Sequence, residues 1–179
     1  MKQLVRKMAA AATIVVVGVA GAGAAADAAA PAADRKPNTR VAVRPMVADA
    51  LGDLGVHVRP FNGAKAYHFR GTVAVNFEIS GTGKGGDRIK HTGGIALRKG
   101  HDRITLRRFW IDLDRNRLSG LVNGQARADL FRLIVPSKRP KLGDVRLRLT
   151  HPAAKAINQT FDVHAFSGGD TFGFATVRS

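Results

Sequence analysis

Apolar and polar residues alternate along much of the chain after residue 56, with the period of two that is typical of a half-buried β-strand. Residues 73–79 place an apolar side chain at every second position, and residues 145–149 alternate leucine or valine with arginine. Other apolar segments of strand length are residues 89–99, 104–113 and 128–135, and residues 166–177 are expected to form a glycine-containing loop and a last strand. The pattern predicts about eight short strands in an antiparallel sheet.

The segment 104–113 contains a change of parity. Ile104 and Leu106 share one face of a regular strand, whereas Phe109 and the apolar residues after it fall on the other. A β-bulge at Arg107 and Arg108 returns all of them to one buried face, because a bulge inserts one extra residue into a strand. Trp110 then falls on the opposite, outer face.

Two short helices interrupt the strand pattern. Residues 45–54 have apolar side chains at helical spacing, with Pro45 at the first position and Gly55 as the C-cap. Thr150 is suited to be an N-cap before a second helix at residues 153–161. The fold class predicted is mainly β, an antiparallel β-sandwich or a barrel-like sheet with two short helices.

Glycine-rich stretches mark the connections. The segment 81–86 contains Gly83 and Lys84 but does not match a phosphate-binding loop, because Glu78 stands where such a loop has glycine and Gly85 where it has serine or threonine. We interpret it as a hairpin connection. Gly93 and Gly94 predict a bulge or a close approach of two backbone segments.

Residues 1–28 have the features of a secretory signal peptide: a basic start, a short apolar centre and small residues before the cleavage site, which we expect near Ala28. Residues 29–39 are predicted to be a disordered tether, and residues 40–179 a single β-rich domain. The sequence after the leader contains no apolar run long enough to span a membrane. We therefore expect a protein that is secreted or associated with the cell envelope.

The chain is strongly basic and contains no cysteine. Its 179 residues include 29 lysines and arginines but 13 aspartates and glutamates, and the formal net charge is +16. Without cysteine the domain has no disulfide and no thiol nucleophile, so its stability depends on the hydrophobic core. A charge of this size attracts polyanions.

No catalytic pattern is present. The six histidines show neither of the helical zinc-protease spacings, and the chain lacks the G-x-S-x-G motif of serine hydrolases. Asp112 and Asp114 lie two residues apart, but they flank a hairpin turn in which acidic residues are common. The sequence therefore predicts neither an enzyme nor a metal site.

Arginines and lysines concentrate in the second half of the chain, which suggests a basic face that binds anionic polymers of the cell envelope. Teichoic acids, anionic lipids and extracellular DNA are the polyanions outside a bacterial cell, and we expect no intracellular nucleic-acid role. The alternative is a basic surface that serves solubility only. The residues expected to contact phosphates or carboxylates are Arg107, Arg108, Arg139, Arg146 and Arg148.

Several short motifs resemble an uncharacterised family of β-domains in exported actinobacterial proteins. They cover nearly the whole chain from Asp49 to Val177. The matching elements are residues 51–56, 91–95, 109–112 and 129–131, followed by Leu149-Thr150, Ala153-Ala154, Ile157-Asn158 and Gly173.

More distantly, residues 93–122 are similar to the HtaA-type domain of bacterial haem-uptake proteins. In both, a Gly-Gly strand, a Gly-His turn (here Gly100 and His101), a leucine-rich strand and an acidic hairpin follow one another. This resemblance implies haem bound by a tyrosine with a histidine behind it. The single tyrosine, Tyr67, lies outside the similar segment, and Tyr67 and His91 are the candidate ligand residues. We therefore expect a non-catalytic binding or structural module without a cofactor, with haem or another small ligand as the alternative.

Overall fold

The structure is a computed structural model that describes residues 36–138 and 140–178. The predicted signal peptide and most of the predicted tether lie outside the described residues. The described elements, in chain order, are β1 (Asn38–Val43), α1 (Pro45–Asp53), β2 (His57–Phe61), β3 (Lys65–Phe69), β4 (Thr72–Thr82), the 3-10 turn η2 (Lys84–Gly86), β5 (Arg88–His91), β6 (Gly94–Lys99), β7 (Asp102–Asp112), β8 (Arg117–Val122), β9 (Ala126–Ile134), β10 (Val145–Leu149), α2 (His151–Phe161) and β11 (Thr171–Arg178).

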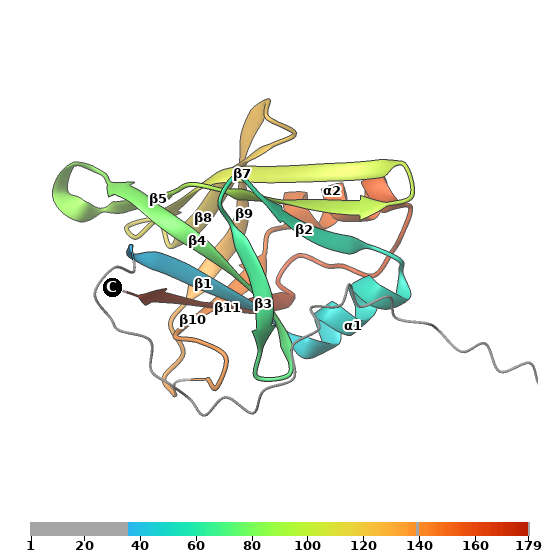
Figure 1. Cartoon of the computed structure of the whole chain (residues 1–179), viewed down its shortest axis with the longest axis horizontal. Coiled ribbons are helices and arrows are strands. Elements are labelled where there is room, and N and C mark those ends of the chain that lie inside the picture. Colours follow the sequence, from blue (N-terminus) through green and yellow to red (C-terminus); the bar gives the residue numbers. More distant parts are fainter. Residues whose placement is uncertain (1–35, 139, 179) are drawn as a thin grey trace, which may run out of the picture. The chain divides into compact units, whose positions relative to one another are not determined.

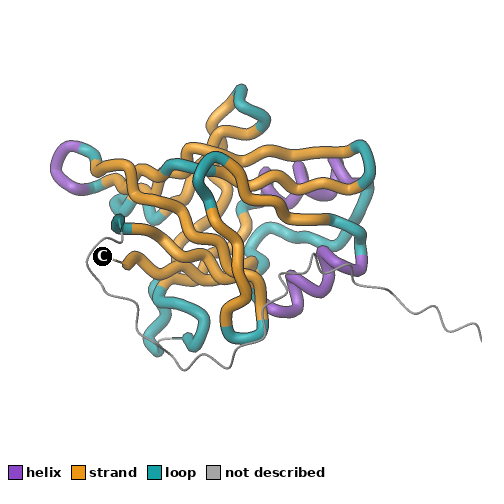
Figure 2. Tube along the Cα trace, viewed as in Figure 1, coloured by secondary structure: helices purple, strands orange, loops and turns teal. Residues whose placement is uncertain are grey.

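Most of the strands close into an antiparallel barrel (Figures 1 and 2). Around the ring the order is β7, β5, β4, β1, β11, β10, β9 and β8, and the pairing of β8 with β7 completes it. The remaining strands extend the sheet: β3 pairs with β4, β6 pairs with the first half of β7, and β2 pairs with β6. The prediction of a mainly-β, barrel-like antiparallel fold with two helices is confirmed.

The predicted bulge in β7 is present. The register with β8 shifts between Arg107 and Trp110, and Arg108 adopts a φ of 51°. As a result Leu106 and Phe109 are both buried, at 8% and 6% exposure, although they lie on opposite faces of a regular strand. The bulge therefore keeps the apolar residues of β7 in the barrel interior and places Trp110 outside.

The segment 89–99, expected as one strand, is two. β5 ends at His91 and β6 begins at Gly94, so both lie along the same edge of β7, one after the other. Gly93 has a φ of 83°, and a Cβ atom there would lie 2.9 Å from the backbone nitrogen of Ala64. The close approach predicted at the glycine pair is therefore real, and it explains why the strand is interrupted at this point.

The second helix has the predicted N-cap. The Thr150 hydroxyl accepts a hydrogen bond from the backbone N–H of Ala153 at 3.2 Å, and the helix runs from His151 to Phe161. It packs against β7 and β9 and buries Ala153, Ala154, Ile157 and Phe161.

The first ordered strand begins slightly earlier than expected. β1 starts at Asn38, so the last two residues of the predicted tether belong to the strand. Thr39 is 2% exposed and points into the barrel, where it contacts His91. Neither helix in the part of the chain that the structure describes is long and apolar enough to cross a membrane.

Candidate functional site

The outer surface of β5, β8, β9, β10 and the second half of β7 carries most of the candidate residues. Strand alternation turns the side chains opposite to the buried ones toward solvent, and pairing then aligns them across the sheet. We call this surface the basic face. Its outward residues are Arg88, Lys90, Arg107, Trp110, Asp112, Arg117, Ser119, Leu121, Arg127, Asp129, Arg132, Ile134, Arg146 and Arg148.

Trp110 is surrounded by cations on the basic face. The guanidinium carbon of Arg127 lies 3.7 Å from the centroid of the indole ring, that of Arg88 lies 5.2 Å away, and the Lys90 ammonium 5.8 Å. Cations within about 6 Å of an aromatic face are attracted by its quadrupole. Attraction to the indole ring therefore allows three positively charged side chains to lie close together.

Two hydrogen bonds fix the Arg127 guanidinium over the indole. Its Nη1 donates to the Ser119 hydroxyl at 3.2 Å, and its Nη2 donates to the Arg108 carbonyl at 2.9 Å. Burial and the charges of Arg88 and Arg108 lower the pKa of Arg127 from its usual value. Arginine nevertheless stays protonated in proteins, so Arg127 is a positioned cation among other cations.

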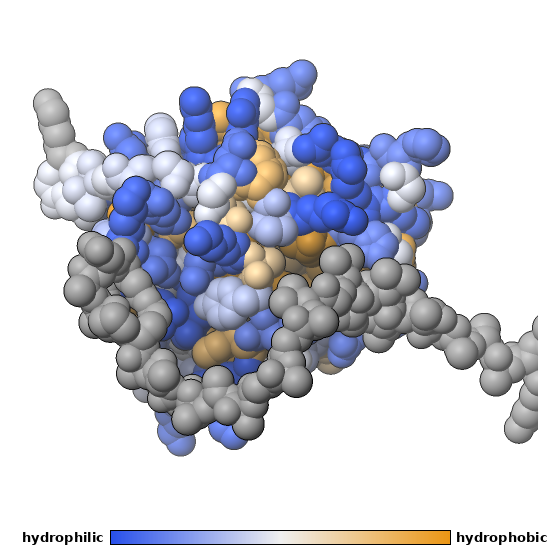
Figure 3. All heavy atoms as spheres, in the orientation of Figure 1, coloured by the Kyte–Doolittle hydropathy of each residue, from blue (hydrophilic) through white to orange (hydrophobic). Residues whose placement is uncertain are grey.

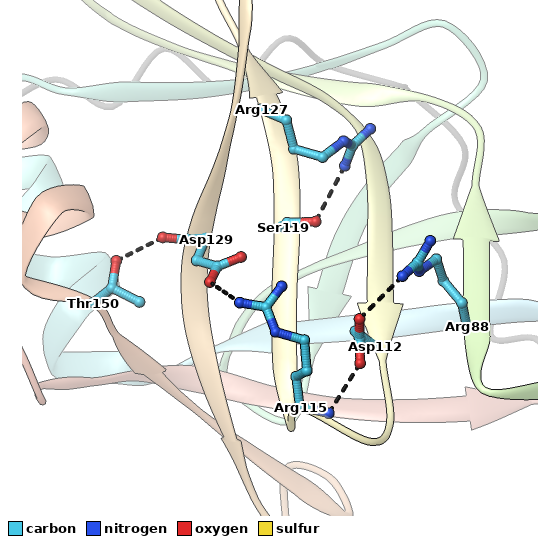
Figure 4. A network of polar contacts seen from close by, with 7 residues as sticks. All are labelled: Arg88, Asp112, Arg115, Ser119, Arg127, Asp129 and Thr150. Carbon is cyan, nitrogen blue, oxygen red and sulfur yellow. Dashed lines mark hydrogen bonds and ion pairs between the residues drawn. The ribbon is translucent and has the colours of Figure 1, made fainter.

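The two carboxylates of the basic face are already engaged (Figure 4). Asp112 accepts from the backbone N–H of Arg115 at 2.9 Å and from Nη2 of Arg88 at 3.2 Å. The hydrogen bond from the Arg115 backbone is the main cause that lowers the pKa of Asp112 below its usual value, and Arg88 lowers it further. Burial raises the pKa, but by less than the backbone bond lowers it. Asp129 lies 3.6 Å from the Arg115 guanidinium. Asp112 thus stabilises the predicted hairpin turn that follows it. The ion-pair partners of Asp112 and Asp129 are Arg88 and Arg115, not Arg132 or Arg148.

Three arginines of the basic face lie side by side. Arg117 on β8 is the register partner of Arg132 on β9, and Arg132 is the register partner of Arg148 on β10. Neighbouring strands are about 4.8 Å apart, so like charges at facing positions repel one another. We call Arg117, Arg132 and Arg148 the arginine row.

The arginine row borders a groove of about 880 Å³. Arg148 is held in place because its Nε donates to the Gly169 carbonyl at 2.5 Å. The start of α2 forms the opposite wall, and its first turn contains no acidic residue. The other residues lining the groove are Arg127, Ala128, Asp129, Ile134, Leu149, Thr150, His151, Pro152 and Gly168.

The structure brings several of the predicted polymer-binding residues to this surface. Arg148 lines the groove, Arg146 lies two residues before it on the outer face of β10, and Arg107 and Arg108 flank the bulge of β7. Arg139 lies outside the described residues. The sequence did not single out Arg88, Lys90, Arg117, Arg127 or Arg132; only the strand register, which places them beside Trp110 or Arg148, identifies them.

Large exposed apolar side chains are few in the described part of the chain. Hydrophilic side chains dominate the face seen in Figure 3, and apolar atoms show only in small areas between them. The exposed large apolar side chains in the described ranges are scattered over several elements: Met46, Leu113, Ile134, Val135 and Val177.

His91 lies inside the barrel. Its Nδ1 is 3.2 Å from the Phe109 carbonyl, which can only accept, so Nδ1 carries the proton and Nε2 accepts from the Thr39 hydroxyl at 2.7 Å. Burial lowers the pKa of His91, and the bond to Phe109 opposes this with a smaller effect. The ring is therefore neutral at pH 7, and both of its nitrogens have partners.

Tyr67 lies on the other side of the sheet. It pairs with Ala74 on the outer face of β4, and its hydroxyl donates to the Asn76 side chain at 3.1 Å. Trp110 is also outside the barrel, but on β7. The structure thus does not gather Tyr67, His91 and Trp110 into one pocket.

The barrel interior is too small for a cofactor. The cavity next to His91 measures about 60 Å³ and is lined by apolar side chains apart from Thr39 and His91. Pockets for drug-sized ligands and cofactors usually measure about 300–1,000 Å³. Within the described residues, no three metal-ligating side chains come together.

Comparison with known proteins adds one structural relative. No family model matches the chain, and no curated protein is similar to it in sequence. The crystal structure of the haem-binding protein HtaB from Corynebacterium glutamicum is similar over 79% of this chain and 95% of that chain, with a TM-score of 0.51 and 10% sequence identity. The distant resemblance to the HtaA-type proteins is thereby confirmed at the level of the fold.

Proposed function

We propose that this chain is a non-catalytic binding module that holds an anionic polymer of the cell envelope against its basic face. The observation that carries the proposal is the arginine row, in which facing positions on three successive strands all bear positive charge. Facing like charges are unfavourable in a sheet, and a bound polyanion would relieve their repulsion.

The charges around the row support the same conclusion. Asp112 and Asp129 are engaged with Arg88 and Arg115, so the groove offers guanidinium groups without a matching number of free carboxylates. Arginine binds phosphate and carboxylate oxygens through two parallel hydrogen bonds, which suits it to such polymers. The predicted signal peptide supports a site of action outside the cytoplasm.

The proposal is tested by binding to immobilised heparin at stepped salt concentrations. We expect retention to fall steeply with salt, because contacts to a polyanion release counterions. The double variant Arg132→Gln/Arg148→Gln is expected to elute earlier and to lower the salt slope by about 2. The matched control is Arg98→Gln/Arg103→Gln, which removes two exposed arginines that face each other on β6 and β7.

The two double variants lower the net charge by the same amount. Any difference between their elution positions therefore comes from the groove and not from the net charge. Unchanged elution of the control and early elution of the row variant support the proposal. Equal shifts of both variants would show that only net charge matters, and elution of the wild type near physiological salt would show that the basic face serves solubility alone. Either result contradicts the proposal.

The second candidate function is haem binding, favoured by the similarity of fold to HtaB. The interior does not fit this group, because the cavity beside His91 is small and both ring nitrogens of His91 are occupied. Tyr67 on the outer face remains, and to bind iron as a phenolate it must lose the proton that it donates to Asn76. A haem titration that gives a saturable Soret band, lost in Tyr67→Phe, would support this candidate, and no Soret shift would dismiss it.

A further inference from the structure

We infer that the groove beside the arginine row binds a phosphate group, which Arg132 and Arg148 hold between them. This inference rests on the proposed function and names the chemical group that the polymer would present there. Arg132 and Arg148 are register partners on β9 and β10, and both line the groove.

The spacing of the row favours phosphate over carboxylate. A carboxylate has two oxygens in one plane and is matched by a single guanidinium fork. A phosphate has oxygens in several directions, so two guanidinium groups that extend from facing positions on neighbouring strands, whose backbones lie roughly 4.8 Å apart, can bind different oxygens of the same group. Arg117, the third member of the row, then lies beside the bound group as a further cation.

The groove is partly organised in advance. The bond from Nε of Arg148 to the Gly169 carbonyl fixes the guanidinium and uses only one of its donors. Arg127 is fixed by Ser119 and by the Arg108 carbonyl. The carboxylate in the groove, Asp129, lies beside the Arg115 guanidinium, which offsets its repulsion of an anion. Arg148 and Arg127 therefore lose little side-chain freedom on binding, which favours affinity.

Arg127 connects the groove with Trp110. Its side chain lines the groove and its guanidinium stacks 3.7 Å from the indole centroid. Trp110 is the one tryptophan of the chain. An anion in the groove lies close to the fixed Arg127 guanidinium and partly neutralises its electric field at the indole ring. The fluorescence of Trp110 therefore reports binding from a single, known place.

The test titrates the full protein with inorganic phosphate, pyrophosphate and succinate, following Trp110 fluorescence and heat by calorimetry. We expect saturable binding of pyrophosphate with a fluorescence change, and binding of succinate at least about tenfold weaker. Arg132→Gln/Arg148→Gln is expected to weaken pyrophosphate about a hundredfold, because charge-assisted hydrogen bonds are lost. Arg98→Gln/Arg103→Gln should bind like the wild type.

Two further ligands separate the possible sources of the phosphate. Glycerol 3-phosphate presents a terminal monoester, and glycerophosphoglycerol presents an internal diester. Tighter binding of the diester assigns the groove to the backbone of a polymer, and tighter binding of the monoester assigns it to a chain end. Either result supports a phosphate site.

Equal affinity for succinate, no saturable binding of any phosphate, or equal loss in both double variants would overturn the inference. These failures are distinct from failure of the proposed function. If heparin retention depends on the arginine row but no phosphate binds, the proposed polymer-binding function stands and the phosphate site is wrong. If phosphate binds but heparin is not retained, the phosphate site stands and the proposal of a polymer ligand is wrong.

Discussion

Replacement of Phe161 by alanine is expected to lower the free energy of unfolding by about 3–5 kcal/mol. Phe161 is 1% exposed and is the largest fully buried side chain among the described residues. It ends α2, which packs against β7 and β9, and its carbonyl accepts from the Lys99 ammonium at 2.8 Å. Truncation removes the apolar contacts and leaves a cavity, because the surrounding side chains relax only partly. Urea unfolding followed by far-UV circular dichroism measures the loss.

The matched control for Phe161 is Val135→Ala. Val135 is 76% exposed, so its truncation is expected to change the stability by no more than about 0.5 kcal/mol. A loss for Phe161→Ala that is no larger than that of the control would show that α2 is not part of the cooperative core.

Acidification is expected to destabilise the fold through His91. Burial lowers the pKa of His91 in the folded protein below the usual histidine value of about 6.5. Below about pH 6.5 the unfolded chain therefore binds a proton that the folded chain does not, and the stability falls as the pH is lowered towards the folded pKa, by at most about 1.4 kcal/mol per pH unit. Above that pH the contribution of His91 is complete and constant.

Denaturant unfolding between pH 7.5 and 5.5 measures this slope, and His91→Gln should flatten it because the titrating group is gone. The control is His101→Gln, since His101 is an exposed residue in the turn before β7. The assignment to His91 is wrong if the slope survives in His91→Gln or disappears in His101→Gln.

Local patterns were sufficient to predict much of the fold. The change of parity between Leu106 and Phe109 required a bulge, and the register shift in β7 shows it where it was expected. Thr150 was recognised as an N-cap because hydroxyl side chains satisfy the free N–H groups at a helix start. Features of this kind depend on residues close together in the sequence, so the sequence alone reveals them.

The candidate site depends on contacts between distant residues, and these could not be predicted. The three arginines of the row come from β8, β9 and β10, and they are brought together by strand register. One hydrogen-bond partner of His91 is Thr39, 52 residues away. The sequence predicted a basic face that includes Arg148, and the structure places Arg148 at the groove. Its neighbours could be identified only from the alignment of β9 between β8 and β10.

The order of the strands around the barrel has a consequence for how the chain folds. β11 lies between β1 and β10, so the ring remains open until the last strand is in place. Contacts between the first and last strands have a large sequence separation and form slowly. During synthesis, β1 and β10 therefore present unpaired edges that are prone to pair with other chains. Placement of β11 pairs both of these edges at once.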